Sequence, residues 1–381
     1  MHEGSILQPT RRSLLASAVA AALPLKARQA PAARVAIAQC DAYDRSLHEA
    51  LGRLLDMLGG AGRLVSGKTV TMKINLTGSP TMRLGVTPAE KAQYTHPAVI
   101  GSLVRLFGDA GARRIRIVEG CFSSDEPLEE FLLAAGWDPA PLAASARQVL
   151  FENTNIAGRH RGYARFLTPH GGHLFPGFDL NRAYDDCDVL VSVAKLKEHA
   201  TCGVTLGMKN MFGATPLTIY GDYAGKDEPD ESAARSGRVM VMHYGRRPPS
   251  RSAPQPKDDG TPRDDKWRMP RIVADLSAAL PVHLAVIDGI DTMAGGEGPW
   301  IQGCRPVHPG LLIAGLNPVC TDAVATACMG FDPMADRGQP PFERCDSFLK
   351  LAEELGVGTR DLRRIEVAGV PVDKARFPFR T

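Results

Sequence analysis

The sequence predicts an α/β protein with a doubly wound, mostly parallel sheet and helices on both faces. Short apolar runs typical of buried strands alternate along the chain with segments that repeat apolar residues at helical spacing. The first strand, helix and strand follow one another at the spacing of a β-α-β unit, which pairs its strands in parallel. The same alternation recurs to the end of the chain, so at least seven strands are expected.

The first elements are defined by local patterns. The apolar runs RVAIAQC and TVTMKINL predict strands, and two glycines end the helix between them. Pro97 suits the first position of a helix, where its missing N–H is not needed. The expected order is a strand at 34–40, a helix at 46–59, a strand at 69–76, a loop at 77–93, a helix at 97–108, a strand at 113–120 and a helix near 126–135.

The second half of the chain continues the pattern after a less regular segment at 153–177. Its expected elements are a central strand at 188–195, a helix at 273–280, strands at 282–290 and 311–316, helices at 322–329 and 347–355, and a last strand at 364–369. Residues 245–266 are Pro-rich and charged with little to bury, which predicts a mobile polar insertion. Residues 33–381 are therefore expected to form one α/β domain.

The first 32 residues predict an export signal of the twin-arginine (Tat) type. Arg11 and Arg12 precede an apolar run at 14–23 that is too short to span a bilayer, and small residues follow at 30–32. The Tat export machinery is then a partner, the location is periplasmic, and no stable membrane span is expected after processing. The alternative is a cytosolic tail that happens to contain an arginine pair.

Charge and cysteine spacing exclude several classes of function. Without residues 1–32 the chain has 41 basic and 41 acidic residues, so nucleic acid is not an expected partner. None of the eight cysteines forms a CxxC pair, so neither a ferredoxin-type iron–sulfur cluster nor a zinc ribbon is expected. The apolar surroundings of Cys121, Cys320 and Cys328 favour buried free thiols over disulfides.

A candidate site follows the central strand, within residues 185–213. Carboxyl ends of parallel strands open into the binding crevice of such sheets, and several cations would repel one another there without an anion. We therefore expect a small anionic ligand. The residues expected to neutralise it are Lys73, Lys195, Lys197 and Lys209, those expected to orient it are Asn75 and Asn210, and those expected to act in catalysis are His199, as general acid or base, with Lys195 and Lys209. The alternative is that the lysines are solvated loop residues.

Two further groups of residues belong to this prediction. The glycine-rich run 293–300 lets backbone N–H groups approach a ligand, so Gly296, Glu297 and Gly298 are expected in the wall of the site. It matches neither GxGxxG nor the Walker pattern, which argues against a nucleotide. Separately, His199, His243 and Asp288 would suit a divalent metal, although no HExxH motif occurs. Asp322 is expected to cap its own helix, and the alternative is that it reaches the site.

Several of these blocks together resemble one family. In order they are KINL (73–76), AKLKEH (194–199), TLGMKNMFG (205–213), DGI (288–290) with GEGP (296–299), and DAV (322–324) before GFDP (330–333). They are similar to the successive blocks of the domain of unknown function (DUF) family 362 and cover about residues 65–370. The resemblance implies no agreed reaction. Some relatives carry a ferredoxin-like iron–sulfur module, for which this chain lacks the cysteine spacing.

The residues favour an exported enzyme that acts on a small carboxylate or phosphate at the carboxyl edge of the sheet. A metal-dependent enzyme that uses His199, His243 and Asp288 is one alternative. A non-catalytic anion-binding protein is another. An imidazole within reach of the anion favours catalysis, whereas a site made only of lysines and backbone amides favours capture.

Overall fold

A mixed sheet forms the centre of the protein in the computed structural model, which describes residues 29–258 and 260–380. Within these residues the sheet has eight strands in the order β14-β1-β13-β10-β7-β2-β3-β4. Their bounds are β1 (Val35–Gln39), β2 (Thr69–Lys73), β3 (Arg114–Glu119), β4 (Val149–Asn153), β7 (Val189–Lys195), β10 (Leu284–Gly289), β13 (Leu311–Gly315) and β14 (Val367–Gly369). The predicted export signal falls almost entirely on residues 1–28, outside the described residues.

Most neighbouring strands in this sheet are parallel. The parallel pairs are β1–β14, β10–β7, β7–β2, β2–β3 and β3–β4. Only β13, among the described strands of the sheet, runs antiparallel to its neighbours β1 and β10. The predicted mostly parallel sheet is therefore confirmed.

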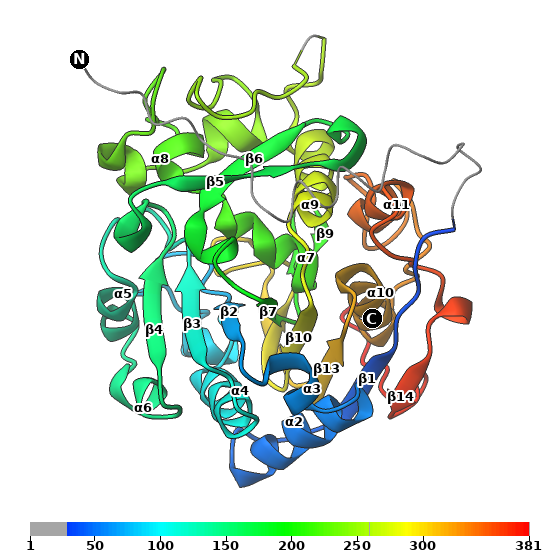
Figure 1. The fold of residues 1–381 in the computed structure, drawn as a ribbon. Coiled ribbons are helices and arrows are strands. Elements are labelled where there is room, and N and C mark those ends of the chain that lie inside the picture. Colours follow the sequence, from blue (N-terminus) through cyan, green and yellow to red (C-terminus); the bar gives the residue numbers. More distant parts are fainter. Residues whose placement is uncertain (1–28, 259, 381) are drawn as a thin grey trace.

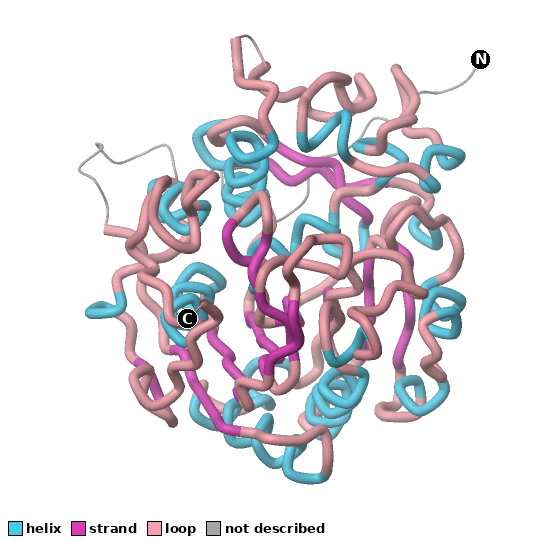
Figure 2. Tube along the Cα trace, turned by 180° about the vertical axis from the view of Figure 1, so that it is seen from behind, coloured by secondary structure: helices cyan, strands magenta, loops and turns pink. Residues whose placement is uncertain are grey.

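Helices cover both faces of the sheet, as predicted (Figure 1 and, from behind, Figure 2). Alternate side chains of β7 divide between two cores: Val191 and Val193 pack with one set of helices, and Leu190 and Ala194 with the other. The first set is α2 (Arg45–Met57), α3 (Ala61–Val65), α4 (Pro97–Asp109), α5 (Leu128–Ala134) and α6 (Ala140–Ala143), and the second is α7 (Leu206–Asn210), α9 (Asp265–Ala279), α10 (Pro318–Cys328) and α11 (Phe348–Glu354).

Local sequence explains where several helices begin. The His96 ring caps α4 by accepting the N–H of Ala98, and Pro97 occupies the first helical position as predicted. Helix α9 begins at Asp265, where Asp264 caps it, instead of at residue 273. The prediction began it too late because its polar first turns show no apolar periodicity. Helix α10 is capped by Asn317, so the prediction that Asp322 caps it is wrong.

Other strands lie outside the central sheet. The segment that seemed irregular contains β5 (Tyr163–Leu167), which pairs antiparallel with β6 (Gly177–Asn181) directly after it, and beyond this pair lies the short helix α8 (Leu217–Tyr220). The other two pairs are β8 (Glu198–His199) with β9 (Gly203–Val204), and β11 (Thr292–Ala294) with β12 (Arg305–Val307). Within 245–266, Ser250 and Ala253 are buried, so this part of the segment packs against the domain. Its mobility remains a prediction.

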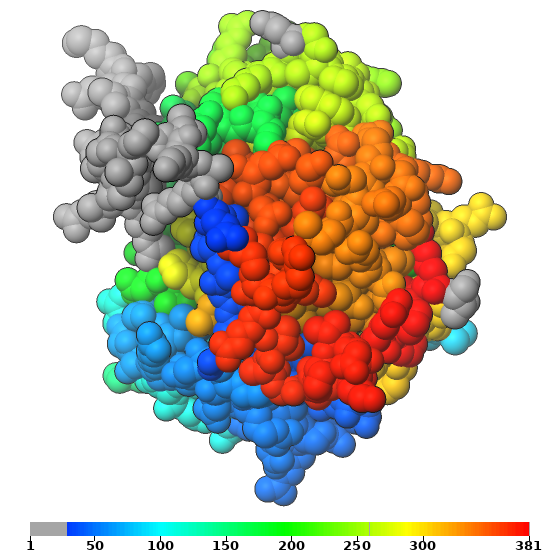
Figure 3. All heavy atoms as spheres, turned by 90° about the vertical axis from the view of Figure 1, so that its right-hand side faces the viewer, coloured from blue at the N-terminus to red at the C-terminus, as the bar shows by residue number. Residues whose placement is uncertain are grey.

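The amino-terminal end of the described chain packs against its carboxyl-terminal part (Figure 3). The Pro31 carbonyl accepts the N–H of Thr359 at 2.9 Å, and the Ala30 carbonyl accepts from Arg364. Packing thus begins before the domain boundary predicted at residue 33. No helix in the described part of the chain is both long and apolar enough to cross a membrane.

The order of the strands places a crevice at one point of the sheet. After β2 the chain adds β3 and β4 toward one edge, and after β7 it adds β10 and β13 toward the other. The strand order therefore reverses between β2 and β7. In open α/β sheets, ligands bind beyond the carboxyl ends of the strands at such a point.

Candidate functional site

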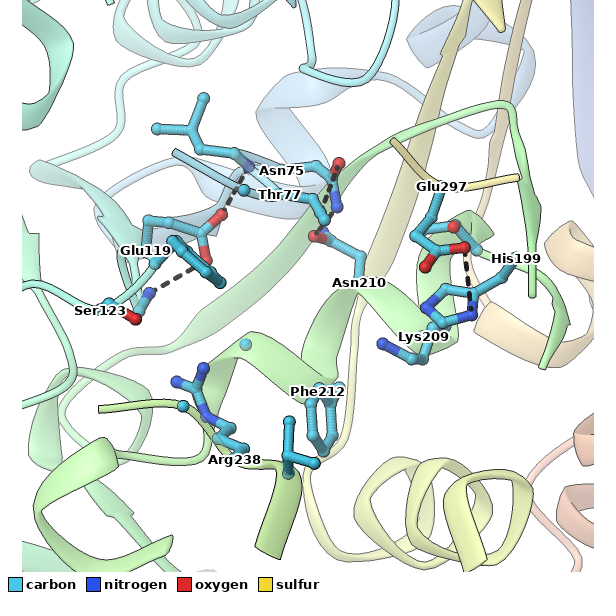
Figure 4. A pocket seen from close by; sticks show the side chains of 18 of the residues that line it. Asn75, Thr77, Glu119, Ser123, His199, Lys209, Asn210, Phe212, Arg238 and Glu297 are labelled. Atoms are coloured by element: carbon cyan, nitrogen blue, oxygen red, sulfur yellow. Dashed lines mark hydrogen bonds and ion pairs between the residues drawn. The ribbon is translucent and has the colours of Figure 1, made fainter. Parts of the chain in front are cut away.

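A cavity of about 400 Å³ lies beyond the carboxyl ends of β2 and β3, beside that crevice (Figure 4). Its walls come from the residues at and after the ends of β2 and β3, from helix α7, from the segment 236–243, which includes a π-helical turn, and from the loop at 297–300. The predicted residues that line it are Lys73, Asn75, His199, Lys209, Asn210, His243 and Glu297. Those that do not are Lys195, Lys197, Asp288, Gly296 and Gly298.

Lys73 is at the cavity wall but has no open donor. Its Nζ lies 2.6 Å from Glu119 Oε1 and also donates to Asn210 Oδ1 and to the Ile74 carbonyl. An ammonium group has three N–H donors, so all three are used, and its charge is balanced by Glu119. Asn75 donates to the same Asn210 oxygen at 3.0 Å. These side chains tie α7 to β2 while they line the cavity, and the ligand-binding roles of Lys73, Asn75 and Asn210 remain predictions.

Lys195 lies outside the cavity in a closed network. Its Nζ donates to Asp288 Oδ2 at 2.8 Å, to the Glu90 carbonyl at 2.9 Å and to the Tyr43 hydroxyl at 3.3 Å. Asp288 in turn accepts from the Tyr43 hydroxyl and the backbone N–H of His96. Both members of the ion pair are fully buried. Each is committed to the other, so the pair gives no support to the catalytic role of Lys195 or the metal-ligand role of Asp288, and both remain predictions.

Lys197 is also buried away from the cavity surface. Its Nζ donates to the carbonyls of Gln93 and Glu297 at 2.7 and 3.1 Å. Burial lowers the pKa of Lys197 to about 7, against the opposing effect of Glu297. Its amine holds two backbone segments together, and its expected contact with a ligand remains a prediction. Gly298 has a different role as well, since its α-carbon packs against the Trp300 ring.

Lys209 differs from the other three lysines. It lies in the last turn of α7, is only 9% exposed, and points its Nζ at the Phe212 ring, 4.4 Å from the centroid. Among residues 29–258 and 260–380, no oxygen or nitrogen acceptor bonds this ammonium group, and no carboxylate pairs with it. Burial lowers the pKa of Lys209. Its donors therefore face the cavity without a partner.

Arg238 supplies a second cation beside the same ring. Its guanidinium carbon lies 5.8 Å from the Phe212 centroid. Nε donates to the Thr215 carbonyl and Nη2 to Asn155 Oδ1, both at 2.8 Å, and no carboxylate in the described chain pairs with it. Burial lowers its pKa to about 10, although Glu119 acts in the opposite direction. The anchored guanidinium still has N–H groups free for a ligand.

His199 and His243 line the cavity as neutral imidazoles. Burial lowers the pKa of each to about 3. His199 Nδ1 lies 3.2 Å from the Thr201 backbone nitrogen and accepts its N–H, so the ring proton is on Nε2. His243 packs edge-on against Phe212, with ring centroids 5.8 Å apart. Neither ring nitrogen of His243 has a hydrogen-bond partner in the described residues.

Glu297 connects His199 to the opposite wall. Its Oε2 accepts the Ala200 N–H at 2.8 Å and lies 3.8 Å from His199 Nδ1, while Oε1 accepts the Trp300 indole N–H at 3.2 Å. Burial opposes ionisation, but the His199 ring and these donors outweigh it and lower the pKa of Glu297 to about 2. The carboxylate is therefore charged at neutral pH and fixes both neighbours.

The predicted metal set is not assembled. No group of three His, Cys, Asp or Glu side chains in the described chain could hold a metal ion. Asp288 is bound to Lys195, while His199 and His243 line the cavity. All eight cysteines are free thiols, and Cys121, Cys320 and Cys328 are buried as expected.

A match to a protein family covers most of the sequence blocks described above. Residues 70–327 match the family described as a domain of unknown function, DUF362. The chain belongs to the DUF362 family. The matched range includes the blocks that hold Lys195, Lys209 and Asn210, so the resemblance found in the sequence is confirmed.

Individual relatives of this DUF362 protein are distant. It is 26% identical to the thylakoid-associated protein sll1697 of Synechocystis sp. over 304 residues. The aligned region covers 78% of this chain and 75% of that protein. A solved Thermotoga maritima protein aligns with a TM-score of 0.35 at 13% identity, over 71% of this chain and 55% of that one. The lactate racemase apoprotein of Thermoanaerobacterium thermosaccharolyticum aligns with a TM-score of 0.32 at 12% identity, over 75% and 56%. The DUF362 chain spans just over half the length of these two solved proteins.

Sequence reasoning missed Glu119, Arg238 and Trp300 in this site. Glu119 could have been found, because it ends the strand RIRIVE next to the one that ends in Lys73. Arg238 lies in a polar stretch without periodicity, and only the fold brings it to Phe212. Trp300 was visible in the glycine-rich run, but its packing on Gly78 depends on a contact between segments far apart in the sequence.

Proposed function

We propose that this DUF362 protein is an enzyme that acts on a small anionic molecule, a carboxylate or a phosphate, bound between Lys209 and Arg238. The observation that carries the proposal is the unpartnered ammonium group of Lys209, a residue that is only 9% exposed and lines the cavity. A buried charge without a counter-ion costs free energy. An anion that binds both cations offsets that cost, and the guanidinium fork suits carboxylate and phosphate oxygens.

The two imidazoles favour an enzyme over a protein that only captures the anion. His199 presents a donor at Nε2, and His243 is a neutral imidazole with one nitrogen able to accept a proton at neutral pH. A bound anion favours the protonated form of a nearby imidazole and so raises its pKa toward the range useful for proton transfer. In this proposal His243 takes a proton from the substrate or its attacking group, and His199 Nε2–H donates a hydrogen bond to the developing negative charge.

Isothermal titration with inorganic phosphate and with acetate tests the binding step. Lys209→Met is expected to weaken binding by about tenfold or more, because it removes the open cation and keeps the packing on Phe212. Lys226→Met, which changes an exposed lysine, serves as the matched control and should bind like the parent. Equal affinity in the parent and in Lys209→Met would refute the site.

Turnover tests the catalytic step separately. The whole chain is incubated with a panel of carboxylates and phosphate esters, and products are followed by mass spectrometry. His243→Gln should retain anion binding and lose most of the turnover, because it keeps a polar side chain but removes the base. Tight binding without turnover of any panel member would favour the alternative, a non-catalytic anion-binding protein.

We also propose that the protein is exported to the periplasm through the Tat machinery. Support comes from the sequence alone, in the Arg11-Arg12 pair and the apolar run that follows it. Cell fractionation of the Arg11→Lys, Arg12→Lys double variant should find the protein retained in the cytoplasm. An unchanged distribution between compartments would contradict this proposal.

A further inference from the structure

We propose that the ligand of this pocket is an aromatic anion, with a carboxylate or phosphate at Lys209 and Arg238 and a single flat ring against Phe122, Val239 and Trp300. The inference rests on the proposed function, since it assumes that the two cations hold an anion. It goes further by naming the other half of the molecule.

The mouth of the cavity carries large apolar side chains that are unusually exposed. Phe122, Val239 and Trp300 are 48%, 44% and 43% exposed, and all three line the same cavity. Exposed apolar residues scattered singly over a surface need no explanation, but a group of them around a pocket marks a binding site. Contact with an apolar ligand would remove these three side chains from water.

The Trp300 ring is held in place before any ligand binds. Its indole N–H donates to Glu297 Oε1 at 3.2 Å, and its ring packs directly against the backbones of Gly78 and Gly298. A Cβ atom at either glycine would overlap the ring, so no larger residue fits there without displacing it. A prearranged aromatic wall loses little entropy on binding, which favours a flat partner.

Glu297 connects the aromatic wall to the polar half of the site. The carboxylate that fixes the Trp300 indole also lies 3.8 Å from His199 Nδ1 and accepts the Ala200 N–H. A ring that stacks on Trp300 is thereby placed in a fixed relation to the imidazole. The apolar part of the ligand then serves to position the reacting group as well as to add affinity.

The size and charge of the cavity limit the ligand to one small ring and one anionic group. A volume of about 400 Å³ lies toward the lower end of small-molecule sites. Only Lys209 and Arg238, among the described residues that line it, are cations without a carboxylate partner. The ionised Glu297 and the paired Glu119 at the same wall disfavour a polyphosphate or a second carboxylate.

Calorimetric titration of the whole chain tests the inference with two matched pairs of probes. Phenyl phosphate is compared with inorganic phosphate, and benzoate with acetate, so that the two kinds of anionic group are separated. The aromatic member of at least one pair should bind about tenfold tighter or more, because burial of a ring against three apolar side chains adds to the charge interaction.

Two variants remove the aromatic wall without changing charge. Trp300→Leu removes the indole, and Gly298→Ala displaces it. In both, the ratio of affinities between aromatic and simple anion should fall toward one. Leu133→Ala, which changes an exposed apolar residue that does not line the cavity, should keep the parent's ratio.

The outcomes separate this inference from the proposed function. If the simple anions bind through Lys209 as tightly as their aromatic partners, the anion site stands and the aromatic ligand is refuted. If the aromatic preference persists in both Trp300→Leu and Gly298→Ala, the ring lies elsewhere and the inference is also refuted. If none of the four probes binds in a Lys209-dependent manner, the proposed function itself fails.

Discussion

Lys195 and Lys209 are both buried, yet their surroundings give their charges opposite effects on stability. Lys195 has Asp288 at 2.8 Å and two further acceptors, so its removal leaves a buried carboxylate without its counter-ion. Lys209 faces only an aromatic ring and the cavity. A residue that binds a ligand is expected to be poorly satisfied before the ligand arrives, and Lys209 meets that condition.

This contrast predicts opposite changes in the free energy of unfolding. Lys195→Met should lower it by about 3 to 5 kcal/mol, as expected when one partner of a buried ion pair is removed. Lys209→Met should raise it by about 1 kcal/mol or more in the free protein, because an uncompensated buried charge is replaced by an apolar group of similar shape. Urea unfolding of both variants measures the two changes. A loss of stability in Lys209→Met would show that its charge is compensated.

His243 predicts how stability depends on pH. Burial lowers its folded-state pKa to about 3, whereas the unfolded chain binds a proton near the usual value of about 6.5. The unfolded state therefore holds more protons in this window, and stability falls as the pH falls from about 6.5 toward 3. One histidine contributes a slope of about 1.4 kcal/mol per pH unit in mid-window. His243→Gln should reduce the slope of unfolding free energy against pH by that amount, and parallel curves for variant and parent would contradict the assignment.

For single residues of the site, the sequence indicates the residue types but not the partners that each side chain bonds. The four lysines follow strand ends or glycines and look alike in the sequence, and three of them prove to be satisfied by acceptors from distant segments such as Glu119, Asp288 and Gln93. Those acceptors could not be paired with particular lysines before the fold was known. The location of the site was predictable, because strand ends are local features.

Among the elements, helix α7 carries Lys209 and Asn210 of the site and is too short to be stable alone. It spans Leu206–Asn210, and its first N–H groups are bonded by the buried carboxyl of Asp322 from α10. Oδ1 accepts from Gly207 and Oδ2 from Met208, each at 2.8 Å. Asp322 thus caps a neighbouring helix instead of its own. The sequence could not reveal this, because the two segments are more than a hundred positions apart.

The cap predicts a positioning role for Asp322. Asp322→Ala leaves two buried N–H groups without acceptors, at a cost of about 1 to 3 kcal/mol each. Because α7 carries Lys209, phosphate affinity should fall with stability, whereas Asp322→Asn, which keeps one acceptor oxygen, should lie between the variant and the parent. Urea unfolding and phosphate titration measure both effects. Asp373→Ala at an exposed aspartate is the matched control, and an unchanged phosphate affinity in Asp322→Ala would refute the positioning role.

For the molecule as a whole, most strands of the sheet were predictable, but the edge strand β4 and the direction of β13 were not. Apolar runs and helical periodicity are local, so they located every parallel strand from β1 to β10 except β4, which lay next to the segment taken as irregular. The antiparallel direction of β13 depends on its pairing with β1 and β10 and has no local signal. The reversal of strand order between β2 and β7 follows from the pairing as well, and it explains why the cavity lies where it does.

The amino-terminal contacts give a last prediction that links export to folding. The predicted signal ends at residue 32, but the carbonyls of Ala30 and Pro31 accept hydrogen bonds from Arg364 and Thr359. A chain that begins at residue 33 loses both bonds and should be less stable than one that begins at residue 29, by about 1 to 3 kcal/mol. If the free energy of unfolding falls with urea concentration at the same slope in both chains, the difference between their urea midpoints measures the difference in stability. Equal midpoints would mean that these residues add nothing to the fold, whereas a lower midpoint for the shorter chain favours processing ahead of Ala30.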